Sequence, residues 1–198
     1  MLSVMGERDR GVAAVTLAFR GVLVDLDGAE EWLVCELARR HGQAPMDRGR
    51  SLARRLRALQ AELGGLAPAV DALAAERGFR WARGAVAVPA TAAACRTLAP
   101  VRPMLEGLDV PALAVAALER ELVESALRPL DGAFAAVVTG RGPRAMLCAA
   151  LERTGLPAGR VVHVGTDRAE LRAAAALGMR VSRPSELADA GRPLAAAS

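Results

Sequence analysis

The chain of 198 residues contains no lysine, asparagine, isoleucine or tyrosine, and aromatic residues make up only 3% of it. All 26 basic residues are therefore arginine, set against 22 acidic residues for a net charge of +4. Nucleic-acid binding calls for a basic stripe interleaved with aromatic side chains that stack on bases. With so few aromatics, and with arginines that alternate with acids along helical segments, we expect no nucleic-acid partner.

Long apolar runs and zinc-type cysteine patterns are also missing. No uninterrupted apolar run reaches about 20 residues, the length that spans a bilayer. Residues 1–10 lack the apolar centre of a signal peptide. The three cysteines, at positions 35, 95 and 148, show no Cys-x-x-Cys or Cys/His spacing. We therefore expect a cytoplasmic protein that does not enter a membrane and holds no zinc.

What the chain does contain is a pair of aspartates, Asp25 and Asp27, directly after an apolar run and before a glycine. We predict a buried first strand from Gly21 to Asp25. Alternate strand residues point to the same side, so both carboxylates can face one site. Like charges this close repel each other unless a cation or a shared proton intervenes. The pair indicates a metal or acid–base site, although Asp-Gly is also a common turn dipeptide.

The rest of the chain divides into two parts by its periodicity. Residues 30–88 carry apolar residues at helical spacing, which predicts helices at 30–40, 48–63 and 67–77 and no strand. From residue 89 onward, short apolar strands alternate with helices, which predicts an α/β, Rossmann-like parallel sheet covered on both faces. We expect a core made of residues 15–29 and 89–198, with a small helical cap inserted at residues 30–88.

The carboxyl ends of the expected strands mark the expected site, because ligands bind there in parallel sheets. After residue 89 the expected strands are 112–116, 134–138, 160–164 and 179–182, and the expected helices are 90–98, 120–127, 144–154 and 170–177. The residues at those strand ends are Asp25, Asp27, Ala117, Thr139, Thr166 and Asp167.

Three stretches of the chain resemble the haloacid dehalogenase (HAD) superfamily, specifically its phosphoglycolate-phosphatase and phosphoglucomutase-like members with a helical cap. Residues 21–28, GVLVDLDG, look like the family's hydrophobic strand followed by DxDG. Residues 113–130 are similar to its second strand and following helix. Residues 161–180, VVHVGTDRAELRAAAALGMR, resemble its last motif, VGDxxxDxxAAxxAGM. The resemblance covers residues 15–186 and implies a HAD-like core with an inserted cap.

The resemblance also implies roles for the matching residues. Asp25 would be the nucleophile that takes the phosphoryl group, and Asp27 the general acid and base. Magnesium would hold the anions together through oxygen ligands, with Asp25, Asp27, Asp167 and Glu170 as the candidate ligands. The implied reaction is hydrolysis of a small phosphorylated metabolite through an aspartyl-phosphate intermediate.

Several positions depart from the family's pattern. Its hydroxyl residue at the end of the second strand falls on Ala117, and the first acid of its last motif falls on Thr166. Its lysine falls near residues 140–143, where an arginine is the available cation and replaces lysine imperfectly. The expected substrate-binding residues are Arg141, Thr139 and Arg144.

The stretch from Asp167 to Glu170 has two interpretations. Its D-x-x-E spacing matches a helix capping box at the point where a helix must begin. The same carboxylates are also the candidates for metal binding. The function is open in the same way: a HAD-like hydrolase with an incomplete site and weak or altered activity, or an inactive HAD-like protein that binds a ligand or a partner protein. The sequence does not indicate an oligomeric state.

Overall fold

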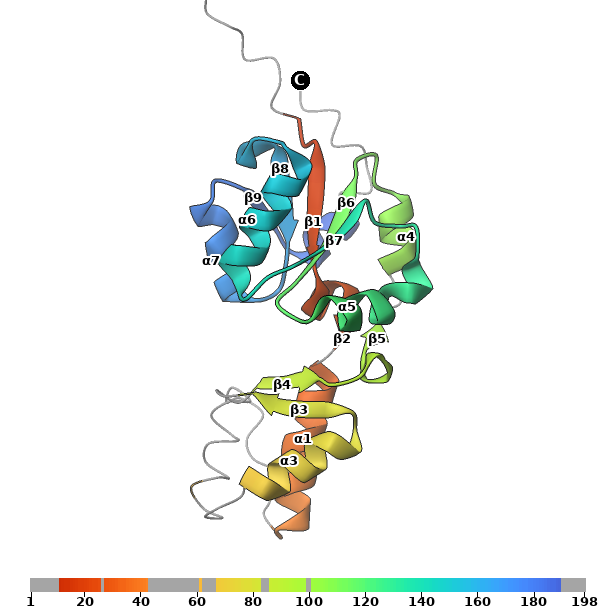
Figure 1. The fold of residues 1–198 in the computed structure, drawn as a ribbon, viewed down its shortest axis with the longest axis vertical. Helices are drawn as coiled ribbons and strands as arrows, with labels where there is room; N and C mark the ends of the chain where they lie inside the picture. Colours follow the sequence, from red (N-terminus) through yellow and green to blue (C-terminus); the bar gives the residue numbers. More distant parts are fainter. Residues whose placement is uncertain are drawn as a thin grey trace, which may run out of the picture. The chain divides into compact units, whose positions relative to one another are not determined.

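The structure is a computed structural model that describes residues 11–25, 27–42, 61, 67–82, 86–98 and 101–189. The chain folds as two compact units, whose elements are drawn in Figure 1. The α/β unit combines Met1–Leu23 with Thr97–Ser198, and the inserted unit is Val24–Arg96. The predicted α/β class with a parallel sheet is confirmed. No helix in the described ranges is long and apolar enough to cross a bilayer.

The α/β unit is built on a five-stranded parallel sheet with the order β7-β6-β1-β8-β9. Its central strand, β1, is buried along its whole length, as expected of a parallel strand covered on both faces. The strands are β1 (Ala14–Ala18), β6 (Ala112–Ala116), β7 (Ala136–Thr139), β8 (Val161–Val164) and β9 (Arg180–Ser182).

Helices cover both faces of this sheet. Figure 1 shows α6 and α7 on one side of β1 and α4 and α5 on the other. On the first side, Met146 and Leu147 of α6 are fully buried against Leu113 and Val115 of β6. The helices are α4 (Val101–Glu106), α5 (Arg120–Leu127), α6 (Pro143–Thr154), α7 (Arg168–Ala176) and α8 (Pro184–Asp189), with single 3₁₀ turns at Arg128–Leu130 and Ala158–Arg160.

The first strand of the sheet differs from the prediction. It ends at Ala18 and is followed by a kinked turn, Phe19–Leu23, in which Arg20 and Gly21 have non-helical backbone angles, and then by a two-residue strand, β2 (Val24–Asp25). Within that turn Gly21 has a φ of 73°, a left-handed conformation that interrupts any strand. The predicted strand from Gly21 to Asp25 is therefore wrong, because the sheet uses the apolar run that precedes it.

The inserted unit is not all-helical, which corrects a second prediction. Helices α1 (Asp27–Arg40) and α3 (Ala67–Glu76) are present, but β3 (Phe79–Ala82) and β4 (Val86–Pro89) form an antiparallel pair. The predicted helix at 90–98 is replaced by a 3₁₀ turn, Ala92–Ala94, and β5 (Arg96–Thr97), which pairs with β2. The expected helix at 48–63 lies outside the described residues, apart from a helical residue 61.

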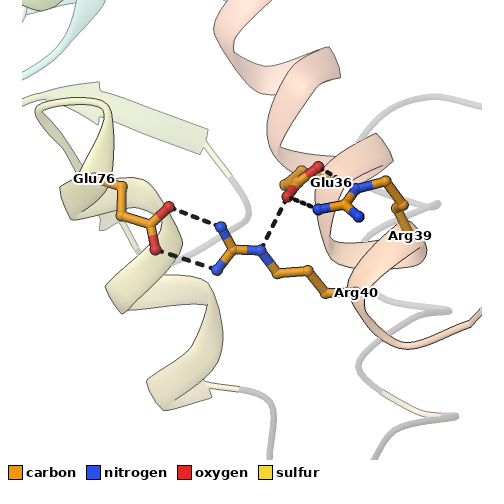
Figure 2. Close-up of polar contacts among 4 residues, drawn as sticks. All are labelled: Glu36, Arg39, Arg40 and Glu76. Atoms are coloured by element: carbon orange, nitrogen blue, oxygen red, sulfur yellow. Dashed lines mark hydrogen bonds and ion pairs between the residues drawn. The ribbon is translucent and has the colours of Figure 1, made fainter.

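Charged side chains join the two helices of the inserted unit (Figure 2). Arg40 of α1 donates two hydrogen bonds to the Glu76 carboxylate of α3, at 3.1 and 2.8 Å. Arg40 and Arg39 also bind Glu36, and hydrogen bonds from Arg39 and then Arg40 hold the pKa of Glu36 at about 2. The Arg40–Glu76 pair is exposed to solvent, and exposed ion pairs contribute little to stability.

Candidate functional site

In the α/β unit the five parallel strands all end at one side of the sheet, which we call the carboxyl edge. Ala18 of β1 lies opposite Val115 of β6, and Leu17 lies opposite Val164 of β8. The segments that follow these three strands therefore leave the sheet side by side. Arg20 follows β1, Ala117 follows β6 and Thr166 follows β8 in these segments.

A close backbone approach ties two of these segments together. A Cβ atom added to Gly21 would overlap the Thr166 side chain, so only a residue without a side chain fits there. The positive φ of Gly21 imposes the same choice for a separate, conformational reason. The turn after β1 is thereby held against the loop that leads into α7.

Asp167 begins α7 as its N-cap. Its Oδ1 accepts hydrogen bonds from the backbone N–H groups of Ala169 and Glu170, at 2.6 and 3.1 Å. These bonds satisfy amides that have no partner within the helix. The capping interpretation of Asp167 is confirmed, while its role as a metal ligand stays a prediction.

Glu170, in the first turn of α7, faces a buried histidine. Its Oε2 lies 3.9 Å from Nε2 of His163, whose side chain is fully buried while that of Glu170 is 15% exposed. On the other side of the imidazole, Nδ1 lies 3.0 Å from the Thr16 hydroxyl. Among the described residues, neither Nε2 of His163 nor Oε2 of Glu170 has a hydrogen-bond partner.

Burial shifts the pKa values of both His163 and Glu170. It raises the pKa of Glu170 to about 7, with a further increase from the Asp167 carboxylate and an opposing decrease from Arg20. Burial also lowers the pKa of His163 to about 4. The imidazole is therefore neutral at neutral pH, and the pair is not an ion pair. The sequence identifies His163 as a buried strand residue but gives no sign of its proximity to Glu170.

The predicted substrate-binding residues come from one connection, between β7 and α6. Thr139 ends β7 and is half-buried, Arg141 is exposed in the loop, and Arg144 is exposed in the first turn of α6. They lie on the same edge of the sheet as Arg20, with β6 between the two strands. Three arginines and a hydroxyl thus share this edge.

Asp25 and Asp27 are not on a strand of the five-stranded sheet. Asp25 is in β2, and Asp27 is the first residue of α1, so both belong to the inserted unit. The prediction that both carboxylates extend from one side of the first sheet strand is wrong, because one residue is in a short separate strand and the other in a helix. Their catalytic and metal-binding roles stay predictions.

The α/β unit does not fit a magnesium site within its described residues. The described ranges contain no group of three or more His, Cys, Asp or Glu side chains placed to hold a metal. Oδ1 of Asp167 already accepts two amide hydrogen bonds, and Glu170 faces His163. Magnesium needs an octahedral set of oxygen ligands, and Thr166 supplies only a hydroxyl at the position where the family's pattern has an acid.

A separate cavity of about 410 Å³ lies beside α5 and the edge strand β7. Glu121, Glu124, Asp131 and Arg128 are among the residues that line it. None of the residues predicted to form the site contributes to its lining.

Comparison with known proteins identifies the fold. No family model and no curated protein matches the sequence. Among solved structures, a conserved haloacid dehalogenase-like protein of unknown function from Agrobacterium tumefaciens is similar at a TM-score of 0.63, with 19% identity over 92% of each chain. A proposed β-phosphoglucomutase from Thermotoga maritima gives a TM-score of 0.62, with 15% identity over 92% of this chain and 99% of the other.

A proposed phosphoglycolate phosphatase from Lactobacillus plantarum is similar as well, at a TM-score of 0.58 and 16% identity over 90% of this chain and 89% of the other. At these identities the similarity concerns the fold. The chain therefore has the fold of HAD-superfamily hydrolases, as its sequence motifs predict.

Proposed function

We propose that this chain is a binding protein on a HAD-like fold and does not hydrolyse phosphate esters through an aspartyl phosphate. The observation that carries the proposal is the identity of the residues at the carboxyl end of β1. The family's pattern of a hydrophobic strand followed by D-x-D-G, placed on the strand that the sheet contains, falls on Ala18-Phe19-Arg20-Gly21. The glycine is present and both aspartates are replaced.

Neither replacement can do the chemistry of an aspartate. The methyl group of Ala18 has no lone pair to attack phosphorus, whereas covalent catalysis needs a nucleophilic oxygen, nitrogen or sulfur. The guanidinium of Arg20 stays protonated throughout the physiological range, so it cannot accept a proton as a general base. Loss of a nucleophile alone lowers turnover by several orders of magnitude.

The composition of the edge favours a small phosphorylated molecule as the ligand. Arg20, Arg141 and Arg144 supply positive charge at the carboxyl edge, and Thr139 supplies a hydroxyl. Arginine binds phosphate oxygens in a bidentate manner, with charge-assisted hydrogen bonds. A ligand bound here would be held and not turned over.

Hydrolysis by Asp25 and Asp27 is the second candidate. The similarity to proteins named as a phosphatase and a phosphoglucomutase favours it. In this version Asp25 would be the nucleophile, magnesium the cofactor, and activity weak because Ala117 and Thr166 replace the family's hydroxyl and acid. A partner protein bound by the same edge is the remaining outcome.

The proposal is tested by measuring binding and turnover on the same samples. We expect small phosphate esters to raise the melting temperature of the protein, since a ligand that binds only the folded state stabilises it. The increase should be lost in Arg141→Ala/Arg144→Ala and kept in Arg153→Ala, a matched exposed arginine in the last turn of α6. No phosphate should be released. Phosphate release above the buffer rate would contradict the proposal, and an absence of any ligand-induced shift would favour a protein partner.

A further inference from the structure

We propose that Arg20 takes the place of a divalent cation at the carboxyl edge of the α/β unit, so that this edge works without metal. The inference rests on the proposed function, because it concerns the same edge. It also follows from the misfit between the described residues and a magnesium site. The positive charge is then a permanent part of the chain and does not depend on an exchangeable ion.

The position of Arg20 places its charge at the centre of the edge. Arg20 is half-buried and extended, with φ −79° and ψ 129°, directly after β1. Its neighbour Gly21 lies against Thr166, the residue at which the chain leaves β8. Because Thr166 leads within two residues into α7, the side chain of Glu170 in the first turn of that helix belongs to the same region.

The chain that leaves Thr166 carries two carboxyl groups, at Asp167, the N-cap of α7, and at Glu170 in its first turn. Carboxylates in one region repel each other unless a cation is near them. In this edge the nearby cation is a guanidinium, which is charged at all physiological pH values.

The same guanidinium works against a metal ion. A divalent cation placed at this edge would be repelled by the fixed charge of Arg20. It would also find a hydroxyl at Thr166, and at Asp167 an oxygen already engaged by two backbone amides. Replacing Arg20 and Thr166 by aspartate removes the repulsion and adds two oxygen ligands of the kind that magnesium prefers.

The test is thermal unfolding of the full chain with about 10 mM MgCl₂, with KCl of equal ionic strength, and with EDTA. We expect the wild-type melting temperature to be the same in all three. The variant Arg20→Asp/Thr166→Asp should gain a magnesium-specific increase of about 3 °C or more. The control Arg153→Asp makes the same charge change in the last turn of α6 and should gain nothing. Circular dichroism establishes that each variant is folded, and Thr166→Asp alone should show a smaller response than the double variant.

Two results would overturn the inference. One is a magnesium-specific stabilisation of the wild-type chain, which needs no variant to be seen. The other is a folded double variant that does not respond to magnesium. Both are distinct from failure of the proposed function, which shows as phosphate release: a chain that released phosphate while ignoring magnesium would refute the proposed function and leave this inference standing.

Discussion

The buried pair of His163 and Glu170 shapes how the stability of the α/β unit depends on pH. Glu170 has a pKa of about 7 in the folded state against a usual 4.5, so its contribution to stability is lost as pH rises from 4.5 to 7. His163 has a pKa of about 4 against a usual 6.5, so its contribution is lost as pH falls from 6.5 to 4. Between pH 4.5 and 6.5 the effects of Glu170 and His163 on stability have opposite signs, so together they leave the free energy of unfolding nearly independent of pH.

A Glu170→Gln substitution should therefore reveal the pH dependence of stability that His163 alone causes. We expect the free energy of unfolding of this variant to rise with pH between about 4 and 6.5, by up to roughly 3 kcal/mol, because each pKa unit corresponds to about 1.4 kcal/mol. Urea unfolding at several pH values measures it, with the wild-type chain as the flat reference. A variant as flat as the wild type would show that burial does not control these two groups.

Gly21 should be among the least replaceable residues of the edge. Gly21→Ala must adopt a positive φ and also overlap Thr166, so we expect it to cost roughly 2–4 kcal/mol of stability. Gly132→Ala is the matched control, because Gly132 has a similar φ of 79° with open space around it, and should cost only about 1 kcal/mol.

A second substitution separates the two contributions at Gly21. Gly21→Ala should lose more stability than Gly132→Ala. Adding Thr166→Ala to Gly21→Ala should restore most of that extra loss, because it removes the overlapping atoms. Chemical denaturation measures all four chains. Equal costs for Gly21→Ala and Gly132→Ala would contradict the close approach of the two segments.

Individual residues could be predicted where their reason is local. The cap formed by Asp167 follows from its spacing to Glu170, and the structure confirms it. The contact between His163 and Thr16 could not be predicted, since 147 residues separate them and only the pairing of β1 with β8 brings them together.

Among the elements, the helix pair α1 and α3 is joined by exposed ion pairs, which we expect to contribute little to stability. Arg40 and Glu76 are 42% and 50% exposed, so water screens their attraction. Leu37 of α1 and Leu73 of α3 are each 1% exposed. The burial of leucine side chains should outweigh the charge network.

A double-mutant cycle on Arg40→Ala and Glu76→Ala tests this balance. We expect a coupling energy much smaller than the cost of Leu37→Ala, which should be about 2–5 kcal/mol. Thermal or urea unfolding of the single and double variants provides the coupling. A coupling as large as the cost of Leu37→Ala would mean that the ion pairs, and not apolar packing, hold α1 to α3.

Strands and helices differ in how well the sequence specifies them. The bounds of β6 and α5 match the prediction, because each is a clear apolar run or a clear amphipathic pattern. The prediction places the first strand one apolar run too late, since periodicity cannot choose between two adjacent apolar runs on either side of Arg20 and Gly21. The hairpin of β3 and β4 is absent from the prediction, which assigns residues 30–88 to helices alone.

For the whole molecule, the proposed function depends on the assignment of that first strand. Moving the strand from Gly21–Asp25 to Ala14–Ala18 removes both aspartates from the end of the central strand and puts Ala18 and Arg20 there. The fold of HAD-superfamily hydrolases is retained, while the residues expected to act as nucleophile and acid are not at that strand end. The fold could be predicted from the motifs, but the position of the site within it required the sheet itself.

The most direct test is phosphate release from a panel of small phosphate esters, with and without magnesium, by the wild-type chain and by Asp25→Asn. We predict that both release phosphate no faster than buffer, since the residues at the carboxyl end of β1 are Ala18 and Arg20. Magnesium-dependent release by the wild type that is abolished in Asp25→Asn would contradict this account and establish Asp25 as the nucleophile.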